Sequence, residues 1–99
     1  MPVETLREAV RTRVAETSQR QTAREIGISA TSIRGFLSDA EPYGPNLLKL
    51  LAWYKWTREG VELGELVNEV GASLAEDQRQ TALTELRRII RDWAERWRA

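Results

Sequence analysis

Apolar residues recur at intervals of three and four along almost the whole chain, and no other feature constrains its fold as strongly. This spacing matches the period of an α-helix, in which every third or fourth residue lies on one face. Alternation with a period of two is confined to Val61 and Leu63, too short a stretch to indicate a strand. The sequence therefore predicts an all-α protein of five to six helices.

The first helix is predicted over residues 3–16, because Pro2 suits a first helical turn and four apolar residues share one face. These four are Val3, Leu6, Val10 and Val14. Arg7 falls on another face of the helix, as do the charged residues near it. We expect the apolar face to join the core.

Two short helices are predicted to meet at a glycine. The S-x-x-Q pattern of Ser18–Gln21 is a capping box, which starts a second helix near Gln19. Gly27 ends that helix, since glycine readily takes the positive φ found at helix C-termini. Ser29 follows at once as the N-cap of a third helix over residues 30–38.

The remaining signals divide the chain into two parts. Residues 39–44 form a loop that holds a proline and a glycine, and a fourth helix begins at Pro45. This helix is apolar nearly all round and must be buried on several sides. Past it, residues 59–77 carry six acidic residues and no basic one. We predict domains at residues 1–58 and 61–99.

The C-terminal domain is predicted to be a helical hairpin. The spacing over residues 63–70 gives a short helix stopped by Gly71, and the last helix spans residues 74–98. Five large apolar residues of the last helix alternate spacings of three and four, which is typical of a coiled-coil seam and predicts a homodimer. They are Leu83, Leu86, Ile90, Trp93 and Trp97.

Composition excludes several chemistries. The chain has no histidine and no cysteine, which removes zinc sites built from these residues, disulfides and histidine-dependent nucleophilic triads. Glu62, Glu65 and Glu69 share a helix face and could hold Mg²⁺ or act as an acid–base pair, but solvated surface helices show this pattern routinely. We expect neither an enzyme nor a cofactor.

Charge is distributed unevenly although the net charge is zero. Residues 1–58 hold nine basic and six acidic residues, and residues 59–99 hold six and nine. A polyanionic partner must therefore meet the first half. No apolar run approaches the ~18 residues of a membrane-spanning helix, and the N-terminus lacks a signal-peptide pattern. We expect a cytoplasmic protein.

The most specific motif is residues 19–38, QRQTAREIGISATSIRGFLS. Gln19 begins it, the small Ala23 lies where two helices would cross, and Gly27 allows the turn. Its inner face carries four apolar residues, Ile26, Ile28, Ile33 and Phe36. The motif resembles the helix-turn-helix of the phage-repressor and Cro-like family of DNA-binding proteins. The resemblance covers residues 3–58 and implies a lambda-repressor-like domain.

Two positions depart from the family pattern. Thr22 lies directly before Ala23, where the family usually has an apolar residue. The loop at Asp39 lacks the family's usual glycine and carries the acidic Asp39 and Glu41. These two acids would weaken phosphate contacts made by the loop.

The resemblance implies that the third helix enters the DNA major groove with its N-terminal residues against base edges. Ala30 and Thr31 fall at base-reading positions, and Gln19 falls where the family braces the backbone and the first base reader. Arg34, one turn further on, is the best donor for the two major-groove acceptors of guanine. The remaining expected contacts are with the DNA backbone: Arg20, Ser29, Ser32, Asn46 and Lys49.

These assignments predict sequence-specific binding of double-stranded DNA by a dimeric transcriptional regulator, such as a bacterial or phage repressor. Its operator would be palindromic and the protein would be associated with the nucleoid. The alternative is a helical interaction module or antitoxin that binds a protein partner through its C-terminal half. Asp39 and Glu41, beside the expected DNA surface, favour this alternative.

The tryptophans leave further alternatives open. Trp53 and Trp56 could form a stacking platform for single-stranded nucleic acid, although their leucine-rich helix is more typical of core packing. Trp93 and Trp97 could contact a foreign protein instead of forming a dimer seam.

Overall fold

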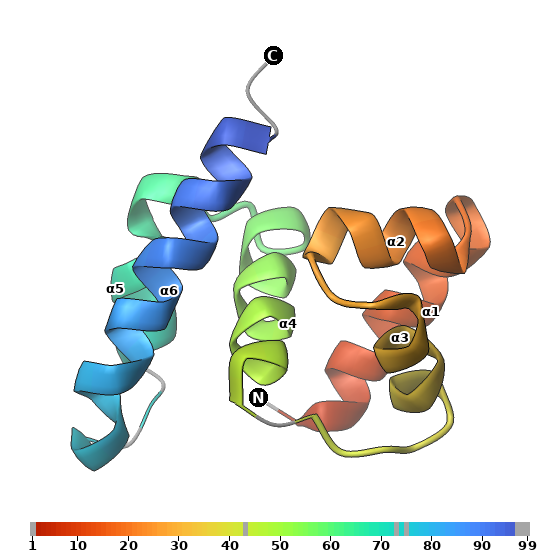
Figure 1. Ribbon diagram of the computed structural model, residues 1–99, viewed down its shortest axis with the longest axis horizontal. Coiled ribbons are helices and arrows are strands. Elements are labelled where there is room, and N and C mark those ends of the chain that lie inside the picture. The colour runs from red at the N-terminus through yellow and green to blue at the C-terminus, as the bar shows by residue number, and fades with distance from the viewer. Residues whose placement is uncertain (1, 43, 73, 75, 97–99) are drawn as a thin grey trace. The chain divides into compact units, whose positions relative to one another are not determined.

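The computed structural model describes residues 2–42, 44–72, 74 and 76–96, and in these ranges it contains helices and no strand (Figure 1). Its helices are α1 (Val3–Glu16), α2 (Gln19–Ile26), α3 (Ala30–Leu37), α4 (Gly44–Thr57), α5 (Leu66–Ala72) and α6 (Glu76–Arg96), with a 3-10 turn η1 (Leu63–Glu65) before α5. The prediction of an all-α chain of five to six helices is confirmed.

The chain divides into two compact units, residues 1–50 and 51–99. The division falls inside α4, whereas the sequence pattern placed it near residue 60. The first half of α4 therefore belongs with α1, α2 and α3, and its second half belongs with α5 and α6. We call these parts unit 1 and unit 2.

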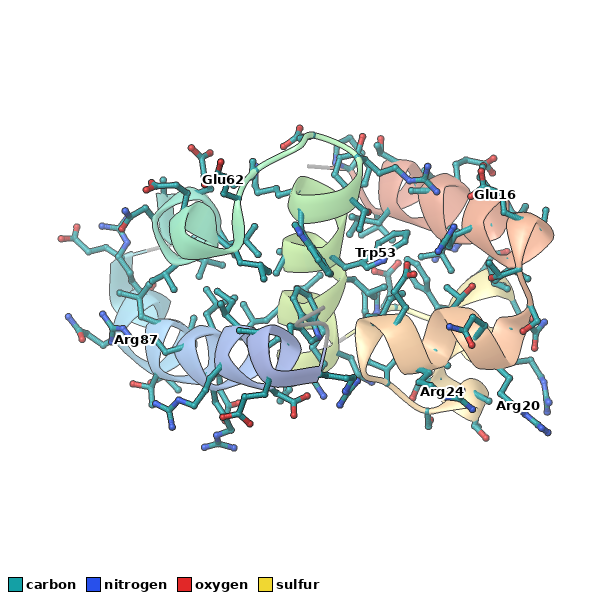
Figure 2. The ribbon with its side chains drawn as sticks, turned by 90° about the horizontal axis from the view of Figure 1, so that it is seen from above. Glu16, Arg20, Arg24, Trp53, Glu62 and Arg87 are labelled. Carbon is teal, nitrogen blue, oxygen red and sulfur yellow. The ribbon has the colours of Figure 1, made fainter. Side chains whose placement is uncertain are left out.

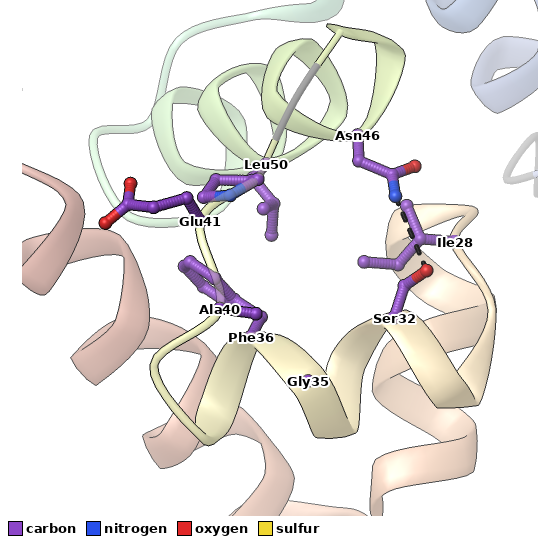
Figure 3. Close-up of a pocket in the computed structure, with 9 residues that line it drawn as sticks. Ile28, Ser32, Gly35, Phe36, Ala40, Glu41, Asn46 and Leu50 are labelled. Carbon is purple, nitrogen blue, oxygen red and sulfur yellow. Dashed lines mark hydrogen bonds between the residues drawn. The ribbon is translucent and has the colours of Figure 1, made fainter.

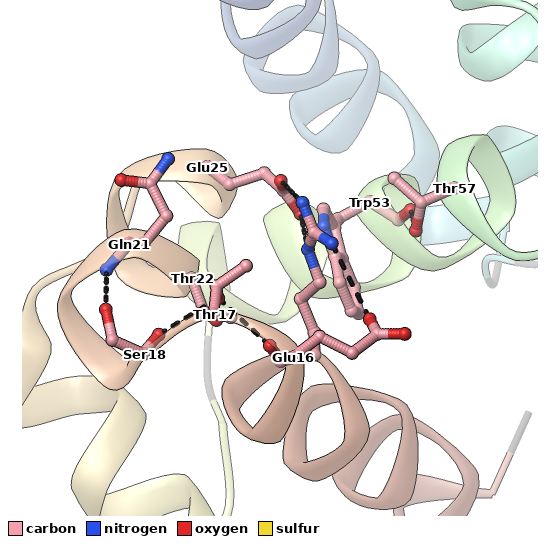
Figure 4. Close-up of polar contacts among 9 residues, drawn as sticks. Glu16, Thr17, Ser18, Gln21, Thr22, Glu25, Trp53 and Thr57 are labelled. Atoms are coloured by element: carbon pink, nitrogen blue, oxygen red, sulfur yellow. Dashed lines mark hydrogen bonds and ion pairs between the residues drawn. The ribbon is translucent and has the colours of Figure 1, made fainter.

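Local signals fix the helix ends of unit 1. The Ser18 hydroxyl accepts a hydrogen bond from the Gln21 backbone N–H at 3.0 Å and so caps α2 (Figure 4). Gly27 ends α2 with φ 91°, the left-handed conformation that favours glycine. The Ser29 hydroxyl accepts from the Ser32 N–H at 3.0 Å and caps α3. The serine caps expected at Ser18 and Ser29 are therefore confirmed.

The core of unit 1 buries the apolar faces of its helices. Its buried apolar residues are Leu6, Val10, Ala23, Ile26, Ile33, Phe36, Leu48 and Leu50. Thr22 is also fully buried, and its hydroxyl hydrogen-bonds with that of Thr17 at 3.2 Å (Figure 4). Burial of a hydroxyl is tolerated when it is hydrogen-bonded, so Thr17 accounts for a threonine at this core position.

Arg7 is buried in unit 1, with 3% of its surface exposed. The sequence pattern placed it away from the apolar face of α1. Its Nε donates to the Phe36 carbonyl at 2.7 Å and its Nη2 donates to the Ala40 carbonyl at 3.4 Å. Its guanidinium also lies 4.9 Å from the centroid of the Phe36 ring and pairs with Glu4. Arg7 thereby ties α1 to the C-terminal end of α3.

Asp39 takes a left-handed backbone conformation, which glycine adopts most readily. Its φ is +76°, in the left-handed region that aspartate tolerates better than most residues. The Ala40 N–H then donates to the Gly35 carbonyl at 2.9 Å, which closes the end of α3. The Asp39 carboxylate lies 3.8 Å from the Nε of Arg7. The second departure from the family pattern is thus accommodated by the buried arginine.

Unit 2 contains an antiparallel pair, α5 and α6, which lie side by side (Figure 1). Its buried apolar residues are Ala52, Trp53, Leu66, Val70, Ala82, Leu86, Ile89 and Trp93. The prediction that Gly71 stops its helix is wrong, because α5 runs to Ala72. A Cβ at position 71 would lie 2.9 Å from Cδ2 of Leu83, so this glycine allows α5 and α6 to approach closely.

Replacement of Arg7 by alanine should lower the free energy of unfolding by about 2–3 kcal/mol, because the buried Phe36 carbonyl loses its donor and the α1–α3 contact loses packing. Urea denaturation followed by circular dichroism measures the change. Arg11→Ala is the matched control, since Arg11 is half-exposed and its partner Glu8 is exposed. We expect it to change stability by less than about 0.5 kcal/mol. Equal effects of the two variants would contradict the role assigned to Arg7.

Candidate nucleic-acid interface

The exposed face of α3 holds the residues expected to read bases. Ala30, Thr31 and Arg34 are exposed, and Ile33 and Phe36 on the opposite side are buried. With 100° of rotation per residue, the three exposed positions fall within one arc of about 100°. The α3 helix therefore presents one small, continuous surface that ends in a guanidinium.

Two arginines extend from α2. Arg20 and Arg24 are exposed, and their side chains leave the same side of the helix (Figure 2). Arg24 was not among the DNA contacts predicted from the sequence. Its spacing of four residues from Arg20 was the available signal, because residues i and i+4 lie on one helix face. Gln19, at the start of α2, is half-buried.

The hydroxyls at the start of α3 form a small network. The Ser29 Oγ donates to the Ser32 Oγ at 2.9 Å, and the Asn46 amide donates to the same Ser32 oxygen at 3.4 Å (Figure 3). A pocket of 220 Å³ lies next to this network, between α3, the loop after it and the first turns of α4. The Glu41 carboxylate points away from the pocket in this view. Ser32 and Asn46 therefore join α3 to α4.

Lys49 connects α4 with the turn of the helix-turn-helix. Its Nζ donates to the Gly27 carbonyl at 2.8 Å, directly after the C-terminus of α2, where a cation is electrostatically favoured. Lys49 and Asn46, both predicted as DNA-backbone contacts, thus have partners inside unit 1. Their ammonium and amide groups hold the two short helices in position.

Four carboxylates of α1 and α2 are paired with arginines of α1. The pairs are Arg7 with Glu4, Arg11 with Glu8, and Arg13 with both Glu16 and Glu25. Arg13 binds Glu25 through two hydrogen bonds of 2.8 and 3.2 Å, and this partner raises the pKa of Arg13. Because Glu25 faces α1, the charge that α2 and α3 present elsewhere comes from Arg20, Arg24 and Arg34.

The two acidic residues after α3 lie at its other end. Asp39 and Glu41 follow the C-terminus of α3, and the helix of eight residues is about 12 Å long. Both are exposed, but Asp39 is also within ion-pair distance of the buried Arg7. The acids are thus separated from Ala30 and Thr31 by the length of the helix.

The tryptophans of unit 2 are occupied within the chain. Trp53 is fully buried, so its ring is not available for stacking on a base. Trp56 is half-buried and stacks on Trp93, with ring centroids 5.5 Å apart and planes at 24°. Core packing therefore accounts for these three rings.

Part of the predicted dimer seam is also core. Leu86 and Trp93 are buried in the single chain, with 0% and 1% of their surfaces exposed, because they pack inside unit 2. They cannot add contact surface for a second copy while unit 2 stays folded. Leu83 and Ile90 remain half-buried. Trp97 lies outside the described residues.

No helix in the described ranges is both long and apolar enough to cross a bilayer. Those ranges contain no group of three or more acidic side chains placed to bind a metal ion. Comparisons with protein-family models, curated proteins and solved structures found no match.

Ser29→Ala should lower the free energy of unfolding by about 1 kcal/mol, since the Ser32 N–H loses its cap. Ser29→Asp should preserve stability, because a carboxylate accepts the same bond and is favoured at a helix N-terminus. Thermal denaturation compares both variants with Ser38→Ala, a matched exposed serine at the other end of α3. If Ser29→Ala were no more harmful than Ser38→Ala, the capping role would be disproved.

Proposed function

We propose that this chain is a sequence-specific DNA-binding protein that inserts α3 into the major groove and acts as a dimeric transcriptional regulator of a bacterium or phage. The observation that carries the proposal is the exposed face of Ala30, Thr31 and Arg34 on α3, together with the exposed Arg20 and Arg24 on α2. An α-helix fits the major groove, where each base pair displays a distinct pattern of donors and acceptors. A dimer would read two half-sites about 34 Å apart.

Each residue of this face suits a different contact. Arg34 would donate two hydrogen bonds to O6 and N7 of a guanine. The Thr31 hydroxyl can donate or accept, and the Ala30 methyl offers only an apolar contact, such as one with the methyl of thymine. The half-site should therefore contain a guanine for Arg34. This guanine would lie about one turn of α3 away from the bases that Ala30 and Thr31 contact.

The DNA backbone would be held by charge and by backbone amides. Arg20 and Arg24 supply two cations on α2. The first N–H groups of α3 lack helical acceptors and lie at the positive end of the helix dipole, which favours phosphate binding. Such contacts displace counterions, so affinity should fall steeply with salt.

The contacts that fix α3 in unit 1 favour a role of this helix in recognising DNA bases. Arg7 holds one end of the helix, and Lys49 and Asn46 hold the turn and the other end. Contacts placed on rigid elements lose less conformational entropy on binding. We propose binding rather than catalysis, because the surface lacks histidine and cysteine and consists of hydroxyls, amides and arginines.

A protein-binding module or antitoxin is the second candidate. The exposed Glu41 and the acidic residues of unit 2 favour it, since acids repel phosphates and suit a basic protein partner. Selection from a random duplex pool at near-physiological salt separates the candidates. Enrichment of an inverted repeat supports the regulator, whereas no enrichment by the folded protein would reject DNA reading and favour the protein partner.

Arg34→Ala should weaken binding to the selected site about tenfold or more and leave affinity for random DNA nearly unchanged, because it removes a base contact. Arg20→Ala should weaken both equally and lower the salt dependence by about one counterion. Fluorescence anisotropy over a salt series measures both effects. Equal losses on specific and random DNA in Arg34→Ala would remove Arg34 as a base reader.

Ser29→Asp separates folding from DNA binding. It keeps the cap of α3 but places a negative charge where a phosphate would bind, so affinity should fall at least about tenfold while thermal stability is unchanged. Ser29→Asn is the uncharged control that also caps the helix. Unchanged affinity in Ser29→Asp would show that no phosphate approaches the start of α3.

A further inference from the structure

The outer face of the α5–α6 pair carries a row of partly covered residues that does not belong to the core. On α6 the row consists of Arg79, Leu83, Ile90 and Ala94, each of them half-buried. At 100° per residue these positions fall within an arc of about 60°. The buried Leu86 and Trp93 lie on the adjoining arc. The three apolar members of this row, Leu83, Ile90 and Ala94, are therefore the apolar surface of α6 that the fold of unit 2 leaves partly accessible.

The row runs into a groove between α5 and α6. The groove has a volume of 360 Å³ and is lined by Val67, Asn68, Gly71, Ala72, Arg79 and Leu83. Arg79 donates from Nη2 to the Leu74 carbonyl at 3.3 Å, but its Nε is buried and makes no hydrogen bond with any described residue. A buried donor without an acceptor is unfavourable, so Arg79 is incompletely satisfied inside unit 2.

Opposite charges border this face. The edge formed by η1 and α5 carries Glu65, the last residue of η1, and Glu69 on α5, which are both exposed and four residues apart. The edge formed by α6 carries the exposed Arg87 and Arg91, also four residues apart (Figure 2 labels Arg87). One hairpin thus has an acidic border and a basic border on the two sides of an apolar groove.

We propose that a second copy of this chain covers the face, with a two-fold axis parallel to α6. Such an axis places each α6 against the partner's α5, so the basic border of one copy meets the acidic border of the other on both sides. An axis perpendicular to α6 would instead place like borders together. Charge complementarity therefore favours a second copy of this chain as the partner and a two-fold axis parallel to α6.

The register follows from the contact inside each hairpin. Gly71 and Leu83 lie at one level of the antiparallel pair. Arg87 is four residues beyond Leu83 on α6, so it is level with position 67 of the antiparallel α5. A two-fold axis parallel to α6 does not change this level. Arg87 therefore lies level with a point between the partner's Glu65 and the partner's Glu69. The dimer thus places two carboxylates of the partner next to the level of Arg87.

This four-helix interface deepens the proposed function by giving the dimer a specific contact surface, but it rests on unit 2 alone. Sedimentation velocity without DNA tests it independently of any operator. We expect the full-length protein to sediment at twice its chain mass of 11.4 kDa at micromolar concentration and to dissociate on dilution. A monomer at every concentration up to about 100 µM would overturn the interface and leave the DNA proposal standing for a monomer.

Charge reversal tests the borders. Arg87→Glu should raise the dimer Kd about tenfold, since each copy loses an attraction and gains a repulsion at two symmetric places. The added change Glu69→Arg should restore the dimer by exchanging the charges. Arg88→Glu is the control, because Arg88 is 71% exposed on the far side of α6. An effect of Arg88→Glu equal to that of Arg87→Glu, or no recovery in the double variant, would overturn the assignment.

Cross-linking tests the orientation, and the chain offers no cysteine of its own. A mixture of Arg87→Cys and Glu69→Cys proteins should form a mixed disulfide under mild oxidation, while neither variant alone should cross-link with itself. Self-linking of Arg87→Cys would indicate the perpendicular axis and refute the parallel one. Circular dichroism confirms that each variant is folded, so a missing cross-link counts against the proposal.

Discussion

The helix-turn-helix of unit 1 depends on one buried cation. Arg7 leaves α1, donates to the carbonyl at the end of α3 and lies over the Phe36 ring. A charge inside a protein is costly unless hydrogen bonds and counter-charges compensate it. Here two carbonyls, Glu4 and the left-handed turn at Asp39 provide that compensation. The end of α3 and the loop after it are shaped around this side chain.

Other polar side chains of unit 1 also join its helices through hydrogen bonds and ion pairs. Lys49 binds the carbonyl after α2, Asn46 binds the hydroxyl at the start of α3, and Arg13 binds Glu25 between α1 and α2. Helices of eight residues are only marginally stable alone, so such contacts must supplement the small apolar core. The outer faces of α2 and α3 carry the exposed Arg20, Arg24 and Arg34. The proposed reading surface is what this internal bonding leaves exposed.

Unit 2 shows how an amphipathic pattern can be assigned to the wrong contact. The stripe of Leu83, Leu86, Ile90 and Trp93 indicated a seam with another chain. Two of these residues, Leu86 and Trp93, are instead buried inside unit 2, where Trp93 stacks on Trp56 of α4. A stripe of apolar residues indicates that one face of a helix is buried, but it does not indicate which element buries that face. Burial separates the two cases. Leu86 and Trp93 belong to the core, whereas Leu83 lines the groove between α5 and α6 and Ile90 is half-buried.

Local chemistry allowed the sequence by itself to determine the helices, their caps at Ser18 and Ser29, and the glycine turn between α2 and α3. Caps, turns and helical periodicity depend on residues within a few positions of one another, so they can be read along the chain. The tertiary structure alone decided that Arg7 is buried, that Thr22 is satisfied by Thr17, and that Lys49 is held by Gly27. Arg7 and Lys49 meet partners more than twenty residues away, and even the nearby Thr17 reaches Thr22 only across a helix boundary. No periodicity encodes such contacts, because packing of the helices in space brings the groups together.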